Sequence, residues 1–258
     1  MSLKRRFDLV IFDWAGTMVD FGCMAPVKAL VEAFSQEGVE ISEAAARRDM
    51  GKSKRDHVVG LLSWPDVDEA WRARHGKAAE DRDVESLMLR LGPLMRENAE
   101  RAATLIPGAR ATFEQVRALG LRVGSSTGYT REMMQPVLAR AAEQGYTPEH
   151  VVCSGETPAG RPTPLMIYKA CADLGVWPLT RVLKVDDAEA GIEEGKAAGA
   201  FTVGVASGNT LALSPEAFAA LSQAERESHV GVAREVLRAA GADLVIDSVA
   251  DLVDALEH

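Results

Sequence analysis

Four consecutive apolar residues, Leu9 to Phe12, end at the carboxylate of Asp13, and this transition constrains the fold more than any other feature. An unbroken apolar run of this length predicts a strand buried on both faces, which is typical of a parallel sheet covered by helices. Open sheets of this kind bind ligands beyond the carboxyl ends of their strands. Asp13 is therefore a candidate catalytic residue, although an aspartate here can equally cap the next turn.

Beyond residue 106 the chain alternates strand-like and helical segments. Five further strands are expected, at residues 121–126, 150–154, 181–187, 201–206 and 243–247. Glycine ends many of the helical segments between them, as is common at helix C-termini. These glycines are Gly120, Gly145, Gly175, Gly199 and Gly241. The alternation predicts a parallel α/β sheet flanked by helices.

Residues 21–101 carry helical patterns and no strand-like run. Helices are expected at residues 26–36, 54–62, 66–75 and 84–100, with apolar residues recurring on one face. The sequence therefore predicts an α/β core domain, formed by residues 1–20 and 102–258, and an inserted all-helical domain, residues 21–101.

Composition excludes several classes of protein. The chain has 258 residues, 47% of them hydrophobic, which suffices for one sizeable core plus an insertion. A net charge of -9 argues against a nucleic-acid or anionic-membrane surface, and no apolar run approaches the roughly 18 residues of a membrane span. Residues 1–6 are basic, but the apolar run behind them ends too soon for a signal peptide. Cys23, Cys153 and Cys171 lack metal-binding spacing, so free thiols and a cytoplasmic location are expected.

Two segments have the composition of anion-binding loops. Glycine and small hydroxyl residues, including Thr127 and Gly128, precede a helical pattern, where backbone N–H groups and the helix dipole favour an anion. The simpler alternative is a capped helix start, with Thr130 as the N-cap. Arg161 lies between glycine and proline and is expected on a loop. There its guanidinium can hold two phosphoryl oxygens or simply be solvated.

Two carboxylates, Asp186 and Asp187, end the strand expected at residues 181–187. Paired acids at a strand end suit Mg²⁺, a hard cation that takes oxygen ligands. The alternative is that they cap the helix expected near Glu189, which fits Asp186 better than Asp187.

The Asp13-Trp14-Ala15-Gly16-Thr17 stretch resembles the first motif of the haloacid dehalogenase superfamily of phosphotransferases. The resemblance implies a Rossmann-like core with a helical cap domain and makes Asp13 the nucleophile. A second aspartate, which protonates an alkoxide leaving group in the superfamily, is replaced here by Ala15. Within the superfamily the stretch looks like the phosphonoacetaldehyde hydrolases, whose leaving group is a carbon.

A carbon–phosphorus bond breaks only if the departing carbanion is delocalised, and a lysine Schiff base supplies that electron sink. The segment from Met50 to His57 is similar to the family's Met-Gly-x-x-Lys-x-Asp-His string, which places Lys54 at the Schiff-base position. Lys52 is expected to be an ordinary solvated residue, and Asp49 stands where the family has proline. The resemblance further implies that Met50, His57 and Tyr129 shape the pocket and assist proton movement.

The resemblance also assigns ligand contacts. Thr127 and Gly128 would contact the phosphonate, and Arg161 would take the place of the superfamily's usual lysine. Mg²⁺ would be held by Asp13, the backbone carbonyl of Ala15 and Asp187. Gly155-Glu156 stands where an acidic pair is expected. Two positions depart from the superfamily pattern: Asp186 replaces glycine, and Gly191 replaces a later acid.

By the resemblance, the chain is expected to cleave phosphonoacetaldehyde, in phosphonate degradation, to acetaldehyde and phosphate. It would act as a cytoplasmic enzyme with a small-molecule partner, no nucleic-acid or membrane partner, and dimerisation through the cap. Two alternatives stay open: a superfamily phosphatase for a small phosphate ester, and a non-catalytic binding protein with the same fold. Ala15 and Lys54 argue against the first, and the intact set of Asp13, Arg161 and Asp187 against the second.

Overall fold

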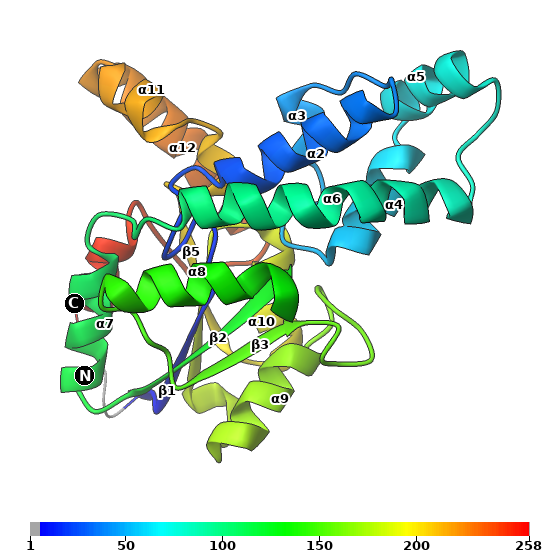
Figure 1. Cartoon of the computed structure of the whole chain (residues 1–258). Helices are drawn as coiled ribbons and strands as arrows, with labels where there is room; N and C mark the ends of the chain where they lie inside the picture. The colour runs from blue at the N-terminus through cyan, green and yellow to red at the C-terminus, as the bar shows by residue number, and fades with distance from the viewer. Residues whose placement is uncertain (1–5, 258) are drawn as a thin grey trace.

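The computed structural model describes residues 6–257 (Figure 1). Its strands form one parallel sheet in the order β3-β2-β1-β4-β5-β6, which confirms the predicted sheet. The strands are β1 Leu9–Phe12, β2 Arg122–Thr130, β3 His150–Ser154, β4 Val182–Asp186, β5 Phe201–Val205 and β6 Leu244–Ile246. The basic segment at residues 1–6 lies, except for Arg6, outside the described residues.

The helices form two groups. The first follows β1 and consists of α2 Met24–Gln36, α3 Glu43–Ala46, α4 Lys54–Ser63, α5 Pro65–His75 and α6 Asp81–Ala102. The second alternates with the strands and consists of α7 Ala109–Ala118, α8 Arg131–Glu143, α9 Leu165–Leu174, α10 Glu189–Ala198, α11 Pro215–Ala220, α12 Gln223–Ala239 and α13 Leu252–Glu257. Short 3₁₀ turns η1 Leu179–Arg181, η2 Asn209–Leu211 and η3 Val249–Asp251 complete the chain.

Both faces of the sheet are covered, as the apolar run in β1 predicts. Val10 and Phe12 face one core, which α7, α8 and α13 complete, whereas Leu9 and Ile11 face the other, built mainly on α9. All four side chains are fully buried. At roughly 1.5–3 kcal/mol for each large apolar side chain, this burial fixes the strand in the centre of the sheet. Asp13 is thereby held at its carboxyl end.

Strand β2 extends four residues beyond its predicted end at Ser126. Thr127 pairs with Cys153 and Thr130 with Ser154, and the register shifts between these two pairs. Gly128 and Tyr129 therefore lie in an irregular stretch of strand, where the sequence predicts a loop. The Thr130 hydroxyl accepts a hydrogen bond from the Met133 N–H, so the predicted N-cap is confirmed.

Helices α2 to α6 form an insert between β1 and β2, above the sheet in Figure 1. Helix α6 packs against α2 and α4 within the insert and also against α8 beside the sheet. The predicted apolar stripe of α6 is buried at Leu87, Leu91 and Met95. The four-residue helix α3 was not predicted because so short a segment shows no apolar period.

No helix within residues 6–257 is long and apolar enough to cross a membrane. The three cysteines are buried and free, as predicted.

The α6 stripe predicts a contrast between two leucines. Leu91 is fully buried and Leu89, two residues away, is 78% exposed. Leu91→Ala should lower the free energy of unfolding by about 2–5 kcal/mol, because it leaves a cavity between packed helices. Leu89→Ala should change it by less than about 0.5 kcal/mol. Urea denaturation followed by circular dichroism measures both, and equal effects would contradict the packing of α6.

Candidate active site

A cavity of about 20 Å³ lies between the carboxyl edge of the sheet and the insert. Its walls include every residue predicted for the site except His57. They also include Cys23, Gly51, Asp186 and Ala188. A space of this size has no room for a substrate.

Three buried carboxylates converge at the base of this cavity. Asp13, Asp186 and Asp187 each offer an oxygen atom, and these atoms lie within 4.8 Å of one another. Burial, with the neighbouring Asp186 charge, raises the pKa of Asp13 to about 6, although Arg161 and Lys184 oppose the shift. Burial together with Asp13 and Asp186 also raises the pKa of Asp187 well above its ordinary value. The cluster therefore favours bound positive charge.

Asp187 is fixed by two hydrogen bonds from segments far apart in the sequence. Its Oδ1 accepts a hydrogen bond from the Thr17 hydroxyl at 2.9 Å, and its Oδ2 accepts one from the Asn209 N–H at 2.6 Å. Each carboxylate oxygen has a second lone pair, so a cation can still be coordinated.

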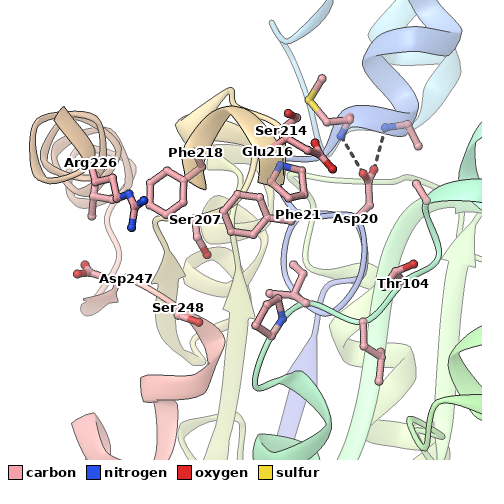
Figure 2. A pocket seen from close by; sticks show the side chains of 18 of the residues that line it. Asp20, Phe21, Thr104, Ser207, Ser214, Glu216, Phe218, Arg226, Asp247 and Ser248 are labelled. Atoms are coloured by element: carbon pink, nitrogen blue, oxygen red, sulfur yellow. Dashed lines mark hydrogen bonds between the residues drawn. The ribbon is translucent and has the colours of Figure 1, made fainter. Parts of the chain in front are cut away.

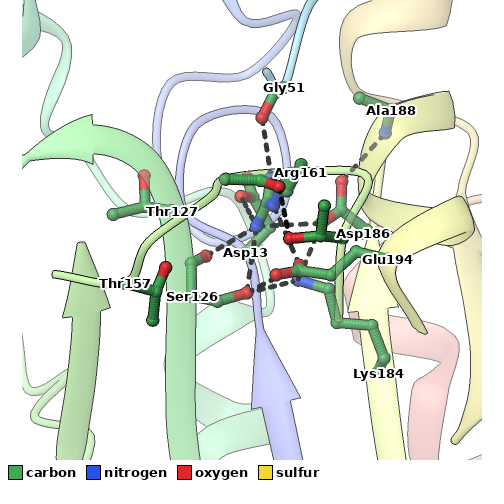
Figure 3. A network of polar contacts seen from close by, with 12 residues as sticks. Asp13, Gly51, Ser126, Thr127, Thr157, Arg161, Lys184, Asp186, Ala188 and Glu194 are labelled. Carbon is green, nitrogen blue, oxygen red and sulfur yellow. Dashed lines mark hydrogen bonds and ion pairs between the residues drawn. The ribbon is translucent and has the colours of Figure 1, made fainter. Parts of the chain in front are cut away.

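Arg161 is buried at the centre of a polar network (Figure 3). Its Nη2 lies 2.8 Å from Asp13 Oδ1 and donates to the backbone oxygen of Ser126 at 2.8 Å. Its Nε donates to Glu194 Oε2 at 2.9 Å. Burial lowers the pKa of Arg161, but Asp186, Glu194 and Asp13 outweigh it and raise that pKa overall, so the guanidinium stays charged.

The residues present fit a divalent cation. Asp13, Asp186, Asp187 and Glu194 are four buried acids, whereas Arg161, Lys184 and Lys54 are three buried cations. The acids outnumber the cations, and a bound Mg²⁺ would offset the excess negative charge. Oxygen donors are also the ligands that Mg²⁺ prefers.

Asp186 and Gly191 depart from the family pattern together, and the structure explains why. Lys184 Nζ lies 2.8 Å from Asp186 Oδ2, and the Ala188 N–H donates to Oδ1 at 3.1 Å. A Cβ atom added at Gly191 would lie 1.9 Å from Asp186 Oδ2. A carboxylate at position 186 therefore leaves no room for any side chain at position 191.

Lys54 enters the cavity from the insert. It is the first residue of α4, whose N-cap Ser53 accepts a hydrogen bond from the Asp56 N–H. Its side chain is buried, and Nζ lies 5.3 Å from the centroid of the Tyr129 ring. Burial lowers the pKa of Lys54 to about 8. Lys52, in contrast, is partly exposed and paired with Asp49, so it lies outside this environment.

His57 lies behind the cavity and does not line it. Its Nε2 is 3.1 Å from the Ala46 carbonyl oxygen, so Nε2 carries the proton. Burial, with the Lys54 charge, lowers the pKa of His57 to about 3, so the ring is neutral. Its Nδ1 has no partner among the described residues.

The loop before α4 lies directly on the irregular end of β2. A Cβ atom added at Gly128 would lie 2.5 Å from the backbone oxygen of Lys52 and 2.8 Å from that of Gly51. Only glycine at position 128 lets the two backbones approach this closely. Arg161 Nη1 reaches the same loop, at 3.5 Å from the Gly51 oxygen.

A larger cavity, of about 1070 Å³, lies elsewhere, beside the segments that join the insert to the sheet (Figure 2). Asp20 lines it and accepts hydrogen bonds from the backbone N–H groups of Met24 and Ala25 at the start of α2. This cavity contains none of the predicted site residues. The smaller cavity is the candidate active site because the buried carboxylates, Arg161 and Lys54 converge there.

Sequence reasoning missed the residues behind Arg161, above all Glu194. In the sequence Glu193-Glu194 looks like a solvated helix face. Glu194 is, however, four residues from both Ala190 and Ala198, so it shares their helix face, and all three are buried. A lone glutamate on a stripe of small residues was the available signal. No signal in the sequence indicated that Cys23 lines the cavity, because Cys23 belongs to no motif.

Comparisons with known proteins show the family to which the chain belongs. The family model for haloacid dehalogenase-like hydrolases matches residues 7–199. The phosphonoacetaldehyde hydrolase of Paraburkholderia phytofirmans is 44% identical over 250 residues, which cover 96% of this chain and 94% of the relative. That of Bacillus cereus is 36% identical over 254 residues, covering 98% and 96%.

Solved structures give the same result. A phosphonoacetaldehyde hydrolase-like protein from Oleispira antarctica matches with a TM-score of 0.95 and 41% identity, covering 98% of this chain and 91% of that one. A predicted phosphoglycolate phosphatase from Haemophilus somnus, at 18% identity and a TM-score of 0.70, covers 96% and 97% and shares the fold alone. The resemblance predicted from the motifs is confirmed. The chain belongs to the phosphonoacetaldehyde hydrolase family of the haloacid dehalogenase-like hydrolases.

Proposed function

We propose that this protein hydrolyses phosphonoacetaldehyde to acetaldehyde and phosphate, in phosphonate degradation. One observation carries the proposal: the buried amine of Lys54, with its lowered pKa, shares a small cavity with the carboxylate of Asp13. Ala15 stands where a leaving-group acid would be needed for an ester. An amine that forms an imine and a carboxylate that attacks phosphorus are the two groups that carbon–phosphorus cleavage requires.

Lys54 acts first in the proposed sequence. Its neutral amine attacks the aldehyde carbonyl, and loss of water gives a protonated imine. Tyr129 lines the same cavity. Its hydroxyl has no hydrogen-bond partner among the described residues, and burial raises the pKa of this hydroxyl well above the ordinary value. It therefore stays protonated and can donate a hydrogen bond to the carbonyl oxygen. Met50 and Cys23 complete the walls around the aldehyde.

Asp13 then attacks phosphorus. The carbon–phosphorus bond breaks, and its electron pair moves through the carbon into the imine, which becomes an enamine on Lys54. The phosphoryl group remains on the Asp13 carboxylate, with Thr127, Gly128 and Arg161 holding its oxygens. Protonation of the enamine carbon and hydrolysis of the imine release acetaldehyde, and water then frees phosphate from Asp13.

Asp13, Asp187 and the Ala15 carbonyl would hold Mg²⁺. When bound, the ion would neutralise the clustered carboxylates and stabilise negative charge on the phosphoryl oxygens. The chain's own contribution is to hold this acidic cluster rigidly through Thr17 and Arg161.

We infer that the insert, residues 21–101, acts as a cap domain over a core formed by residues 1–20 and 102–258. Lys54 belongs to the cap and Asp13 to the core, so closure both completes the site and excludes water. We also propose a cytoplasmic homodimer joined through the cap. Exposed apolar side chains on the insert, Val59 and Trp64, support that contact.

The direct test measures phosphate and acetaldehyde released from phosphonoacetaldehyde, beside a panel of small phosphate esters. Equal amounts of both products from the phosphonate, with little ester hydrolysis, are expected. Preference for an ester would favour the phosphatase alternative, and no turnover of either class would favour a binding protein.

Asp13→Asn should reduce turnover by roughly 10³-fold or more, because an amide cannot form the phospho-enzyme. Steady-state phosphate release measures the loss, and circular dichroism checks the fold. Near-normal turnover in a folded variant would remove Asp13 as the nucleophile.

Chelation should abolish turnover, and added Mg²⁺ should restore it. Asp187→Ala should weaken Mn²⁺ binding, followed by electron paramagnetic resonance, by roughly 10-fold to 100-fold or more. Asp186→Ala should weaken it less, because Lys184 and the Ala188 N–H already engage the Asp186 oxygens. The reverse order would show that the pair is wrongly assigned.

Acetaldehyde with cyanoborohydride should alkylate Lys54, as located by peptide mass mapping. Lys54→Arg should abolish both this adduct and turnover, since a guanidinium forms no imine at neutral pH. Lys52→Arg is the matched control and should retain both. An adduct on another lysine would contradict the assignment.

The trapping rate should also depend on pH. Imine formation needs the neutral amine, so the rate should be half-maximal near pH 8, in line with the lowered pKa of Lys54. It should fall about tenfold for each pH unit well below that point. A midpoint near 10.5, the ordinary value for lysine, would show that the amine is not desolvated.

A further inference from the structure

Glu194 and Lys184 lie behind the reaction cavity, and neither lines it. Both are fully buried, Lys184 on β4 and Glu194 on α10. Two buried charges that touch no substrate are costly unless their partners need them. The partner of Glu194 is Arg161, which also contacts Asp13, and the partners of Lys184 are Ser126 and Asp186 (Figure 3).

We propose that Glu194 is a positioning residue for Arg161, fixing the guanidinium so that its other nitrogens meet the phosphoryl group on Asp13. This inference rests on the proposed function. Glu194 Oε2 accepts from Arg161 Nε at 2.9 Å, which leaves Nη1 for the site, while Nη2 is shared between Asp13 and Ser126. Nη2 then lies 2.8 Å from Asp13 Oδ1, and Nη1 is 3.5 Å from the Gly51 oxygen of the insert.

The distances separate this role from simple neutralisation of Lys184. Glu194 Oε2 lies 2.9 Å from Arg161 Nε but 3.5 Å from Lys184 Nζ. The nearest acid to Lys184 is instead Asp186, at 2.8 Å. The main ion-pair partner of Glu194 is therefore Arg161.

Lys184 and Ser126 help to fix the positions of the Glu194 and Arg161 side chains. The Ser126 hydroxyl lies 3.1 Å from Glu194 Oε2, 2.9 Å from Lys184 Nζ and 3.1 Å from Arg161 Nη2. Guanidinium, carboxylate and ammonium therefore share one hydroxyl. A glutamine at position 194 would keep the shape but remove the charge, and its amide N–H groups would face cations.

The test compares Glu194→Gln with Glu193→Gln, an exposed neighbour on the same helix. Glu194→Gln should weaken phosphate binding in Mg²⁺, measured by calorimetry, by roughly 10-fold to 100-fold. KM for phosphonoacetaldehyde should rise with it. Trapping of acetaldehyde on Lys54 should stay within about twofold, because that step needs no phosphoryl contact. Glu193→Gln should match the native protein in every measurement.

Normal phosphate binding in a folded Glu194→Gln variant would overturn the proposal, and so would a parallel loss of trapping, which marks a purely structural role. If Glu194→Gln does not fold, Glu194→Asp replaces it in the test. Its shorter carboxylate should cause a smaller loss of phosphate affinity, with normal trapping of acetaldehyde on Lys54. Unchanged phosphate affinity in this variant would overturn the proposal. If the proposed function were wrong, the native protein itself would show neither trapping on Lys54 nor turnover. Phosphate binding could still be compared between the native protein and the variants in that case.

Discussion

The ion pair between Arg161 and Asp13, buried at 2.8 Å, is the interaction on which the rest of the site depends. Charges this deep are stable only within a fully paired network, and removal of one partner from a buried pair costs about 3–5 kcal/mol. Strands β1, β2 and β4, helix α10 and the loop that carries Arg161 each supply part of that network. The sheet core therefore has to be assembled before the nucleophile is correctly placed.

Arg161 and Lys54 both lie at the candidate active site, but their surroundings have opposite effects on their pKa values. Arg161 is surrounded by carboxylates and keeps its charge, whereas burial lowers the pKa of Lys54 to about 8. The difference suits their chemistry, because an anion-binding guanidinium must stay charged and an imine-forming amine must lose its proton. Lys54 comes from the insert and is desolvated where the insert packs against the sheet.

Much of the fold was predictable from local pattern. Apolar runs located all six strands, and the motifs located nearly every residue that lines the cavity. Asp13 and Asp187 directly follow strand ends, whereas Met50, Lys54 and Arg161 were located only by the resemblance of their motifs. The irregular end of β2 was not predictable, since pairing of Thr130 with Ser154 depends on a neighbouring strand. His57 fell outside the cavity because the side on which a helix packs is decided by tertiary contacts. Glu194 was missed for the same reason, and the exclusion of side chains at position 191 by Asp186 required three-dimensional distances.

The central claim is a division of labour in which Lys54 captures the aldehyde and Asp13 removes phosphorus. Borohydride reduction of the Asp13→Asn variant with phosphonoacetaldehyde, followed by mass mapping, tests it most directly. The variant should accumulate an imine that cannot transfer its phosphoryl group, so the reduced adduct on Lys54 should retain phosphorus. The native protein should give a phosphorus-free ethyl adduct at the same residue. A phosphorus-free adduct in the variant, or no adduct on Lys54, would contradict the account.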